Sequence, residues 1–268
     1  MADKKKQLLA HLSAANHQHL NELNDERERA IAKMRDLGAR TDASTRQTLI
    51  GYLTQQDNDL LRPLAASRLS EIGGRDVVRE LLALLDTETL EDSIRALIVQ
   101  IIAEIGDSHA TPHLIRLLYQ SDWVETQRRT AFALGKTGGD GVYEALNQTL
   151  HDAQDKKLRQ QVIAALGWLG DVRCIPDLLQ IMQIDPDKET RTFAVEALGR
   201  TGADECYQPL VNLLHSDDLP IVRYYAAHAL GLMADRRAIP HLERITNDSQ
   251  EHAWVAQMAR ESLAKLSA

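Results

Sequence analysis

The sequence has few aromatic residues, few cysteines and no long apolar run. Aromatic side chains make up 4% of the 268 residues, so a core must be largely aliphatic, which favours helices over a β-sandwich or β-barrel. Two cysteines do not make a disulfide framework in a chain of this length. No stretch approaches the roughly 20 apolar residues of a membrane span, and no secretory signal is visible. A cytoplasmic protein without a membrane partner is therefore expected.

An excess of positive charge is also missing. The chain carries 31 Lys and Arg against 39 Asp and Glu, for a net charge of −8. Proteins that bind nucleic acid through its phosphates normally present a prominent excess of cations. Nucleic acid is therefore not an expected partner, and a DNA-binding enzyme is disfavoured.

Glycine recurs with a regular spacing, which indicates an internal repeat. Successive members of the series are separated by 35, 33, 32, 32, 32, 32 and 33 residues. A glycine in this place is typical of a helix end with left-handed backbone. The series consists of Gly38, Gly73, Gly106, Gly138, Gly170 and Gly202, and is continued by Ala234 and Ser267.

Apolar residues keep fixed distances from these positions. The residue four places earlier is apolar in all eight repeats, and the residues eight places and one place earlier complete one helical stripe. A second helix follows each glycine, and from Gly73 onward a leucine lies eight places on. No strand pattern is present. The sequence predicts an all-α superhelix, an α-solenoid of about 7–8 helix pairs over residues 25–268, with residues 1–24 as a capping helix or tail.

The repeat unit is best seen in residues 223–242, where Arg, Ala, Leu, Gly, Asp and Pro hold the offsets that recur along the chain. Ankyrin and TPR repeats have similar periods, but their signature residues do not recur. The pattern resembles the HEAT-like repeats of the phycobilin lyases (PBS lyase HEAT-like, or E–Z type, repeats). The resemblance implies a helical scaffold or adapter and, as an alternative, a bilin lyase or bilin chaperone.

Three recurring residue types have structural interpretations. Arginines eleven places before the glycine series should bond an Asp or a carbonyl of a neighbouring layer. A second set of glycines, three places before the series, should let adjacent helices approach closely. Cys174 and Cys206 share one offset and are expected to be reduced and buried. The second glycine set is Gly135, Gly167, Gly199 and Gly231.

Residues for catalysis or metal binding are not indicated. Deoxyhypusine hydroxylase, a HEAT-like di-iron enzyme, takes its ligands from His-Glu pairs, and this sequence has no His-Glu dipeptide. His17 and His19 are interpreted as solvated, and His113 and His241 as exposed at helix starts. No nucleophile lies in a constrained turn of the kind that hydrolases use. No catalytic residue, metal or cofactor is therefore predicted.

One face of the glycine-terminated helices does predict binding. Offsets 13, 9, 6 and 2 residues before the glycine series lie opposite the buried stripe, and from the fourth repeat onward they carry aromatic and basic side chains. Exposed aromatic residues, Met and Arg are typical of interface cores. We expect a protein partner in a concave groove here, with the chain acting as a monomer or as half of a heterodimer. The expected groove residues are Arg129, Phe132, Lys136, Trp168, Phe193, Arg200, Tyr225, His228, Trp254 and Met258.

Overall fold

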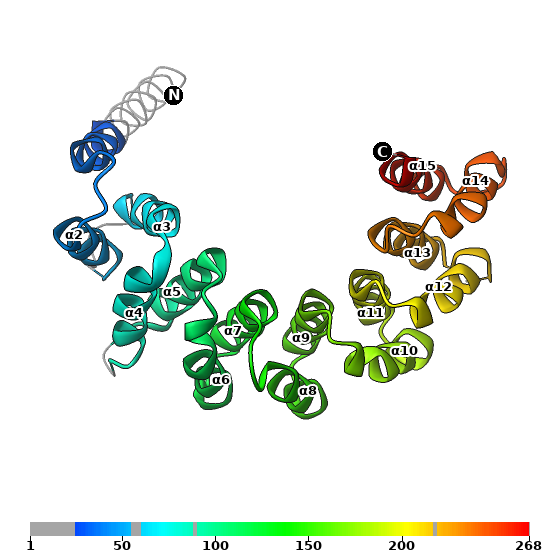
Figure 1. The fold of residues 1–268 in the computed structure, drawn as a ribbon, viewed down its shortest axis with the longest axis horizontal. Helices are drawn as coiled ribbons and strands as arrows, with labels where there is room; N and C mark the ends of the chain where they lie inside the picture. Colours follow the sequence, from blue (N-terminus) through cyan, green and yellow to red (C-terminus); the bar gives the residue numbers. More distant parts are fainter. Residues whose placement is uncertain (1–24, 55–59, 88–89, 217–218, 268) are drawn as a thin grey trace, which may run out of the picture. The chain divides into compact units, whose positions relative to one another are not determined.

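The computed structural model describes residues 25–54, 60–87, 90–216 and 219–267. Over these ranges every regular element is a helix and none is a strand (Figure 1). The all-α prediction is therefore confirmed. The predicted cap at residues 1–24 lies outside the described residues, as do His17 and His19. The chain divides into two compact units, Met1–Ile101 and Ile102–Ala268.

The first unit contains the N-terminal repeats. Its described part begins with a helix over residues 25–37. Three further helices and most of a fourth follow. The fourth, α5, crosses the division between the units. These helices are α2 (Ala43–Thr54), α3 (Leu61–Ile72), α4 (Gly74–Leu85) and α5 (Asp92–Ile105).

The second unit contains five helix pairs in two layers. In Figure 1 the helices that precede the glycine series form its inner layer, and their partners form the outer layer. The inner helices are α7 (Val124–Thr137), α9 (Lys156–Leu169), α11 (Lys188–Thr201), α13 (Pro220–Leu232) and α15 (Ala253–Ser267). The outer helices are α6 (Thr111–Gln120), α8 (Val142–Asp152), α10 (Ile175–Ile184), α12 (Asp204–Ser216) and α14 (Ile239–Asn247). Short 3-10 turns, η1 (Ser108–Ala110), η2 (Val172–Cys174) and η3 (Arg236–Ala238), lead into α6, α10 and α14.

The helices follow the predicted repeat. In chain order, those described form seven consecutive pairs, from α2/α3 to α14/α15, which agrees with the α-solenoid of about 7–8 pairs. The residue four places before each glycine is fully buried in α7, α9 and α11, as Leu134, Leu166 and Leu198. Replacing such a leucine with alanine typically costs 2–5 kcal/mol, so this stripe is a main source of stability.

The glycine series ends its helices as predicted. All six glycines have a positive φ, between 57° and 72°, and Gly170 and Gly202 are left-handed as predicted. Ala234 also has a positive φ, 54°, and is the one non-glycine residue with positive φ in the described part of the chain. A left-handed conformation costs a residue with a β-carbon roughly 1–2 kcal/mol. The end of α13 is therefore strained where its equivalents are not.

The second set of glycines marks close contacts between inner helices, as predicted. A β-carbon added to Gly167 would lie 2.6 Å from Cα of Ala197 on α11, and one added to Gly199 would lie 2.6 Å from Cα of Ala229 on α13. At Gly135 the nearest atom would be the backbone oxygen of Ala165, at 2.6 Å. None of these glycines leaves room for a side chain. The inner layer is stacked backbone to backbone.

The two cysteines behave as core residues. Cys174 and Cys206 are free and fully buried. Burial raises the pKa of the Cys174 thiol to about 12 and also raises that of Cys206. Both shifts disfavour the thiolate form, and the free, buried side chains agree with the structural interpretation.

The arginines eleven places before the glycine series bond either backbone carbonyls at helix ends or acidic side chains. Arg62 Nε donates to the carbonyl of Leu53 at 3.1 Å, and Arg191 Nε donates to that of Met182 at 2.9 Å. These carbonyls lie at the end of the preceding helix, where a cation also complements the helix dipole. Arg159 instead pairs with an acid of the next helix pair, Asp185, which is 4% exposed. These arginines therefore join neighbouring helices, as expected.

Candidate functional site

The aromatic and basic residues predicted to line a groove all lie on the inner helices of the second unit. We call the surface formed by Arg129, Phe132, Lys136, Trp168, Phe193, Arg200, Tyr225, His228 and Trp254 the inner face. Trp168 and Trp254 are exposed, with fractions of 40% and 37%. Lys136 is exposed as well, and the remaining six residues are half-buried. Whether this surface binds a partner stays a prediction.

Met258 is the exception, and its predicted exposure is wrong. Its side chain is 9% exposed, and its sulfur lies 3.9 Å from the hydroxyl of Ser262, one turn later on α15. Ser262 packs against Gly231 of α13. The long, flexible side chain of Met258 therefore fills space between α13 and α15. We exclude it from the inner face.

Trp168 is the centre of a cluster of cations. Lys136 Nζ lies 3.5 Å from the centre of the Trp168 ring, and the Arg200 guanidinium carbon lies 3.8 Å from it. The three residues come from α7, α9 and α11, which are consecutive inner helices. Lys136 also lies 5.9 Å from the ring of Phe132. Cation–π contacts of this kind contribute about 0.5–2 kcal/mol each, so the exposed indole is held in one orientation.

A second group of aromatic residues lies on α13 and α15. Tyr224 contacts both Tyr225, with ring centres 5.3 Å apart, and Trp254, at 5.5 Å. His252 contacts Trp254 at 5.1 Å. Burial raises the pKa of Tyr225 and lowers that of His228, so both side chains are uncharged at neutral pH. Tyr224 and His252 were not predicted, because they lie outside the four offsets that define the face.

The ridge expected from Trp168, Phe193 and Tyr225 is divided into these two clusters. Across the residues that the structure describes, no ring contact links Phe193 to Trp168 or to Tyr225. Phe193 is half-buried among the inner helices instead. The cations at Trp168, rather than a neighbouring ring, organise the middle of the inner face.

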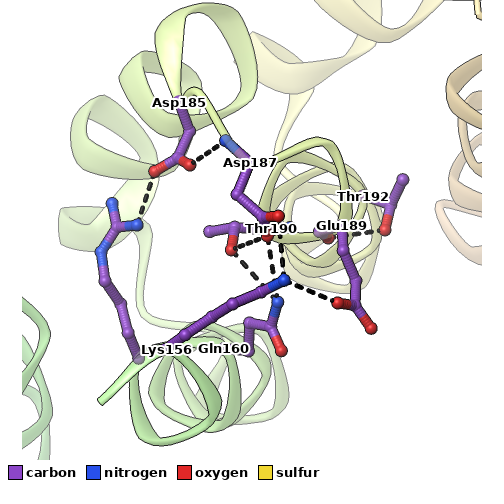
Figure 2. A network of polar contacts seen from close by, with 8 residues as sticks. Lys156, Gln160, Asp185, Asp187, Glu189, Thr190 and Thr192 are labelled. Carbon is purple, nitrogen blue, oxygen red and sulfur yellow. Dashed lines mark hydrogen bonds and ion pairs between the residues drawn. The ribbon is translucent and has the colours of Figure 1, made fainter. Parts of the chain in front are cut away.

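A polar network joins the start of α9 to the turn before α11 (Figure 2). Lys156 Nζ lies 2.9 Å from Asp187 and 3.0 Å from Glu189. Asp187 also accepts hydrogen bonds from the backbone and hydroxyl of Thr190, at 2.8 and 2.7 Å. Lys156 and Thr190 together lower the pKa of Asp187 to about 2. Every group drawn has a partner within the network, so it fastens two layers and offers no open site.

Two matching contacts lie where the 3-10 turns begin. Arg173 stacks on Tyr143 at 4.1 Å, and Arg237 stacks on Tyr207 at 4.4 Å. Each tyrosine hydroxyl donates to the backbone carbonyl of its arginine, at 3.1 and 2.8 Å. The two pairs are separated by two repeats. The sequence pattern did not predict them, because each contact joins residues of two different repeats, 30 positions apart.

The histidines of the described ranges are not grouped as a metal site. His113 and His241 are half-buried, so their predicted exposure is wrong. His241 Nδ1 lies 3.1 Å from Nε2 of His215, and the Nδ1 of His113 is buried without a hydrogen-bond partner. Within the described ranges, no three His, Cys, Asp or Glu side chains are grouped as a metal ion requires.

Two cavities lie at the turns between outer and inner helices, away from Trp168. One, of about 330 Å³, is lined by residues that include His151, Asp177 and Ile184. The other, of about 380 Å³, is lined by residues that include Tyr119 and Val124. Both are shallow depressions between consecutive helix pairs.

None of the described helices has the length and apolarity to cross a bilayer.

Comparison with known proteins supports this architecture. The chain matches the HEAT-repeat family over residues 88–167, 111–185 and 175–264. It is 32% identical over 87 residues to a HEAT repeat-containing taxis protein of Halobacterium salinarum, a match over 32% of this chain and 21% of that protein. The match thus spans about a fifth of the relative's length.

Two solved structures share the fold at low identity. The complex of CpcE and CpcF of phycocyanin lyase from Nostoc sp. PCC7120 gives a TM-score of 0.53 at 20% identity, covering 82% of this chain and 94% of the other. The Escherichia coli protein YibA gives 0.52 at 16% identity, covering 88% and 86%. The family matches extend over more than half of the sequence, and the chain therefore belongs to the HEAT-repeat family.

Proposed function

We propose that this protein is a non-catalytic scaffold that holds a protein partner against its inner face. HEAT repeats indicate a protein-interaction scaffold in general terms. The observation that carries the proposal is Trp168, which is 40% exposed and flanked by Lys136 and Arg200. Tryptophan and arginine dominate interface hot spots. A fixed, exposed indole in a chain so poor in aromatic residues supports a binding role.

The proposal is tested with two tryptophans of matched exposure. Trp168 on the inner face and Trp123 at the turn before α7 are 40% and 37% exposed. A partner is first identified by affinity purification of the full chain from its native source and mass spectrometry. We expect Trp168→Ala to weaken that partner by about 2 kcal/mol or more in titration calorimetry. Trp123→Ala should leave the affinity unchanged.

Folding is measured on the same variants. Because both rings are exposed, both alanine variants should keep the helicity and melting temperature of the parent within a few degrees. Normal binding by a folded Trp168→Ala protein would contradict the proposal. Trp123 is the control because its ring is exposed like that of Trp168, whereas His113 and His241, although also away from the inner face, are half-buried.

A tetrapyrrole is the second candidate occupant of the inner face. Two cations beside one indole could pair with the two propionates of a bilin, and the fold is similar to that of CpcE and CpcF of phycocyanin lyase. Co-expression with a bilin separates the two candidates. A bilin-binding protein would be purified with a visible absorption band that Lys136→Gln and Arg200→Gln together abolish, whereas a protein scaffold would be colourless.

A further inference from the structure

The acidic residues of α7, α9 and α11 are already neutralised. Glu125 lies 2.8 Å from Arg128 and 2.9 Å from Arg129. Glu196 lies 2.7 Å from Arg200. The remaining acid of these three helices, Glu189, pairs with Lys156 at 3.0 Å. The inner face therefore presents no unpaired carboxylate in its central part.

Lys136, in contrast, has no acidic partner. Among the described residues it forms no ion pair although it is exposed, and the same holds for Lys157, which lies outside the inner face at the start of α9. Lys136 is held on Trp168 by cation–π contact alone. A chain with a net charge of −8 thus has a local excess of positive charge at its most exposed inner-face aromatic residue. A partner of complementary charge is anionic.

The spacing of the two cations at Trp168 indicates how the acidic groups of the partner should be spaced. Lys136 Nζ and the Arg200 guanidinium carbon lie 3.5 and 3.8 Å from the centre of the Trp168 ring, so the two charges are no more than about 7.3 Å apart. Side chains two residues apart on an extended peptide lie on the same side, about 6.6–6.8 Å from one another. Two carboxylates with this spacing can reach both cations. The edge of the indole would then meet an apolar side chain of the same peptide.

We propose that the partner's docking element is an extended acidic segment, with carboxylates at positions i and i+2 and a neighbouring apolar residue. The proposal rests on the proposed function and specifies the chemistry of its partner. One carboxylate binds Lys136, the other binds Arg200, and the apolar side chain packs against Trp168. Glu196, which shares Arg200, limits how strongly that arginine attracts the peptide.

A nucleic acid fits these observations less well. Nucleic-acid affinity depends on many phosphate contacts along a basic surface, whereas here Arg128, Arg129, Lys156 and Arg200 are each shared with Glu125, Glu189 or Glu196. A few cations next to an aromatic residue match a short segment with two charges and one apolar anchor.

The test is a selection from a random peptide display library on the immobilised full chain. We expect the enriched peptides to carry Asp or Glu at i and i+2 beside an apolar residue. Synthetic fluorescent copies should bind with an affinity that falls as salt is raised. Lys136→Gln combined with Arg200→Gln should weaken them by about tenfold or more. As a control, Arg236→Gln, which removes an exposed cation on η3 away from the inner face, should leave the affinity unchanged.

A substitution with the opposite effect sharpens the test. Glu196→Gln frees Arg200 from its acidic partner, so acidic peptides should bind it several-fold more tightly than the parent. A purely structural role for the Glu196–Arg200 pair would instead lower affinity in both the Glu196 and the Arg200 variants. The melting temperature of each variant reports whether folding is intact.

The outcomes separate this inference from the scaffold proposal. If the enriched peptides lack acidic residues but still require Trp168, the proposal of an acidic segment is wrong. The scaffold proposal is not affected by that result. Peptides that bind Trp168→Ala as well as the parent overturn both. A single-stranded dT20 oligonucleotide whose binding requires Lys136 and exceeds that of the peptides overturns the acidic segment in favour of nucleic acid.

Discussion

The N-terminal helices α3 and α5 and the later inner helices α7 to α13 use the same repeat differently. Three residues before the glycine series, α3 and α5 have Ser70 and Ala103, whereas the four later helices have glycine. Two residues before it, α3 and α5 have Glu71 and Glu104, where α7, α9 and α11 have Lys136, Trp168 and Arg200. Close backbone stacking and the aromatic–cation surface therefore occur together.

This coincidence has a physical reason. Where inner helices approach backbone to backbone, side chains from three consecutive helices can reach one another across the surface. The contact of Lys136 and Arg200 with one indole needs that approach, because the two cations come from the helices that flank α9. The glycines are thus positioning residues for the inner face as well as packing devices.

The largest expected effect comes from filling the space at a stacked glycine. Gly199→Leu should lower the free energy of unfolding by about 3 kcal/mol, the upper part of the range for overpacking, because even a β-carbon would lie 2.6 Å from Ala229. Urea and thermal unfolding measure the change. The reverse exchange in α5, Ala103→Gly, should cost only about 1 kcal/mol from helix propensity. An unchanged melting temperature for Gly199→Leu would show that the helices are not stacked this closely.

Acidification should destabilise the protein through the half-buried histidines His215 and His228 of its C-terminal repeats. Burial lowers the pKa of His228, with Lys265 and Arg200 adding to the shift and Glu196 and Glu261 opposing it. Burial, Arg244 and His241 likewise lower the pKa of His215. The unfolded chain binds protons near pH 6.5 before the folded chain does, so stability falls as the pH drops below about 6.5.

The measurement is the melting temperature between pH 7.5 and pH 5.5. We expect a decrease of a few degrees. His215→Gln combined with His228→Gln should make the decrease smaller, since these side chains then no longer titrate. A decrease of the same size in the double variant would assign the effect to other groups.

A smaller effect, of opposite sign, is expected at Ala234. Ala234→Gly removes the strain of a β-carbon at φ 54° and should stabilise the protein by up to about 1 kcal/mol, after the entropy cost of glycine. Gly170→Ala, at the equivalent end of α9 with φ 70°, should destabilise it by a similar amount. Urea unfolding of both variants is the measurement, and a loss of stability in Ala234→Gly contradicts the explanation.

The smallest expected effect concerns thiol modification: the two cysteines should not react in the folded protein. Both thiols are buried, and the pKa of Cys174 is about 12, so neither should react with a thiol-specific reagent such as DTNB until the chain unfolds. Complete modification in guanidinium chloride serves as the control. Rapid modification of either thiol under native conditions would mean that the outer layer opens locally.

The repeat period predicted most of the fold because one helix pair contacts mainly its neighbours. The helix ends at the glycine series, the buried stripe and the stacked glycines could all be read from residues at fixed offsets. The inner face was predicted less well, because side-chain direction also depends on the adjacent helix. Met258 shares its offset with Phe193 and Tyr225, yet it turns inward beside Ser262. The Tyr143–Arg173 contact depends on two residues 30 positions apart, which a single-repeat pattern does not show.

The cations around Trp168 also have a spectroscopic consequence. Indole emission responds to nearby charge, and the chain has only three tryptophans, Trp123, Trp168 and Trp254. With Trp123 and Trp254 replaced by phenylalanine, the remaining fluorescence would report on the one ring that Lys136 and Arg200 touch. Any ligand that draws either cation away from the ring would change that emission. The protein thus carries its own optical probe at the centre of its inner face.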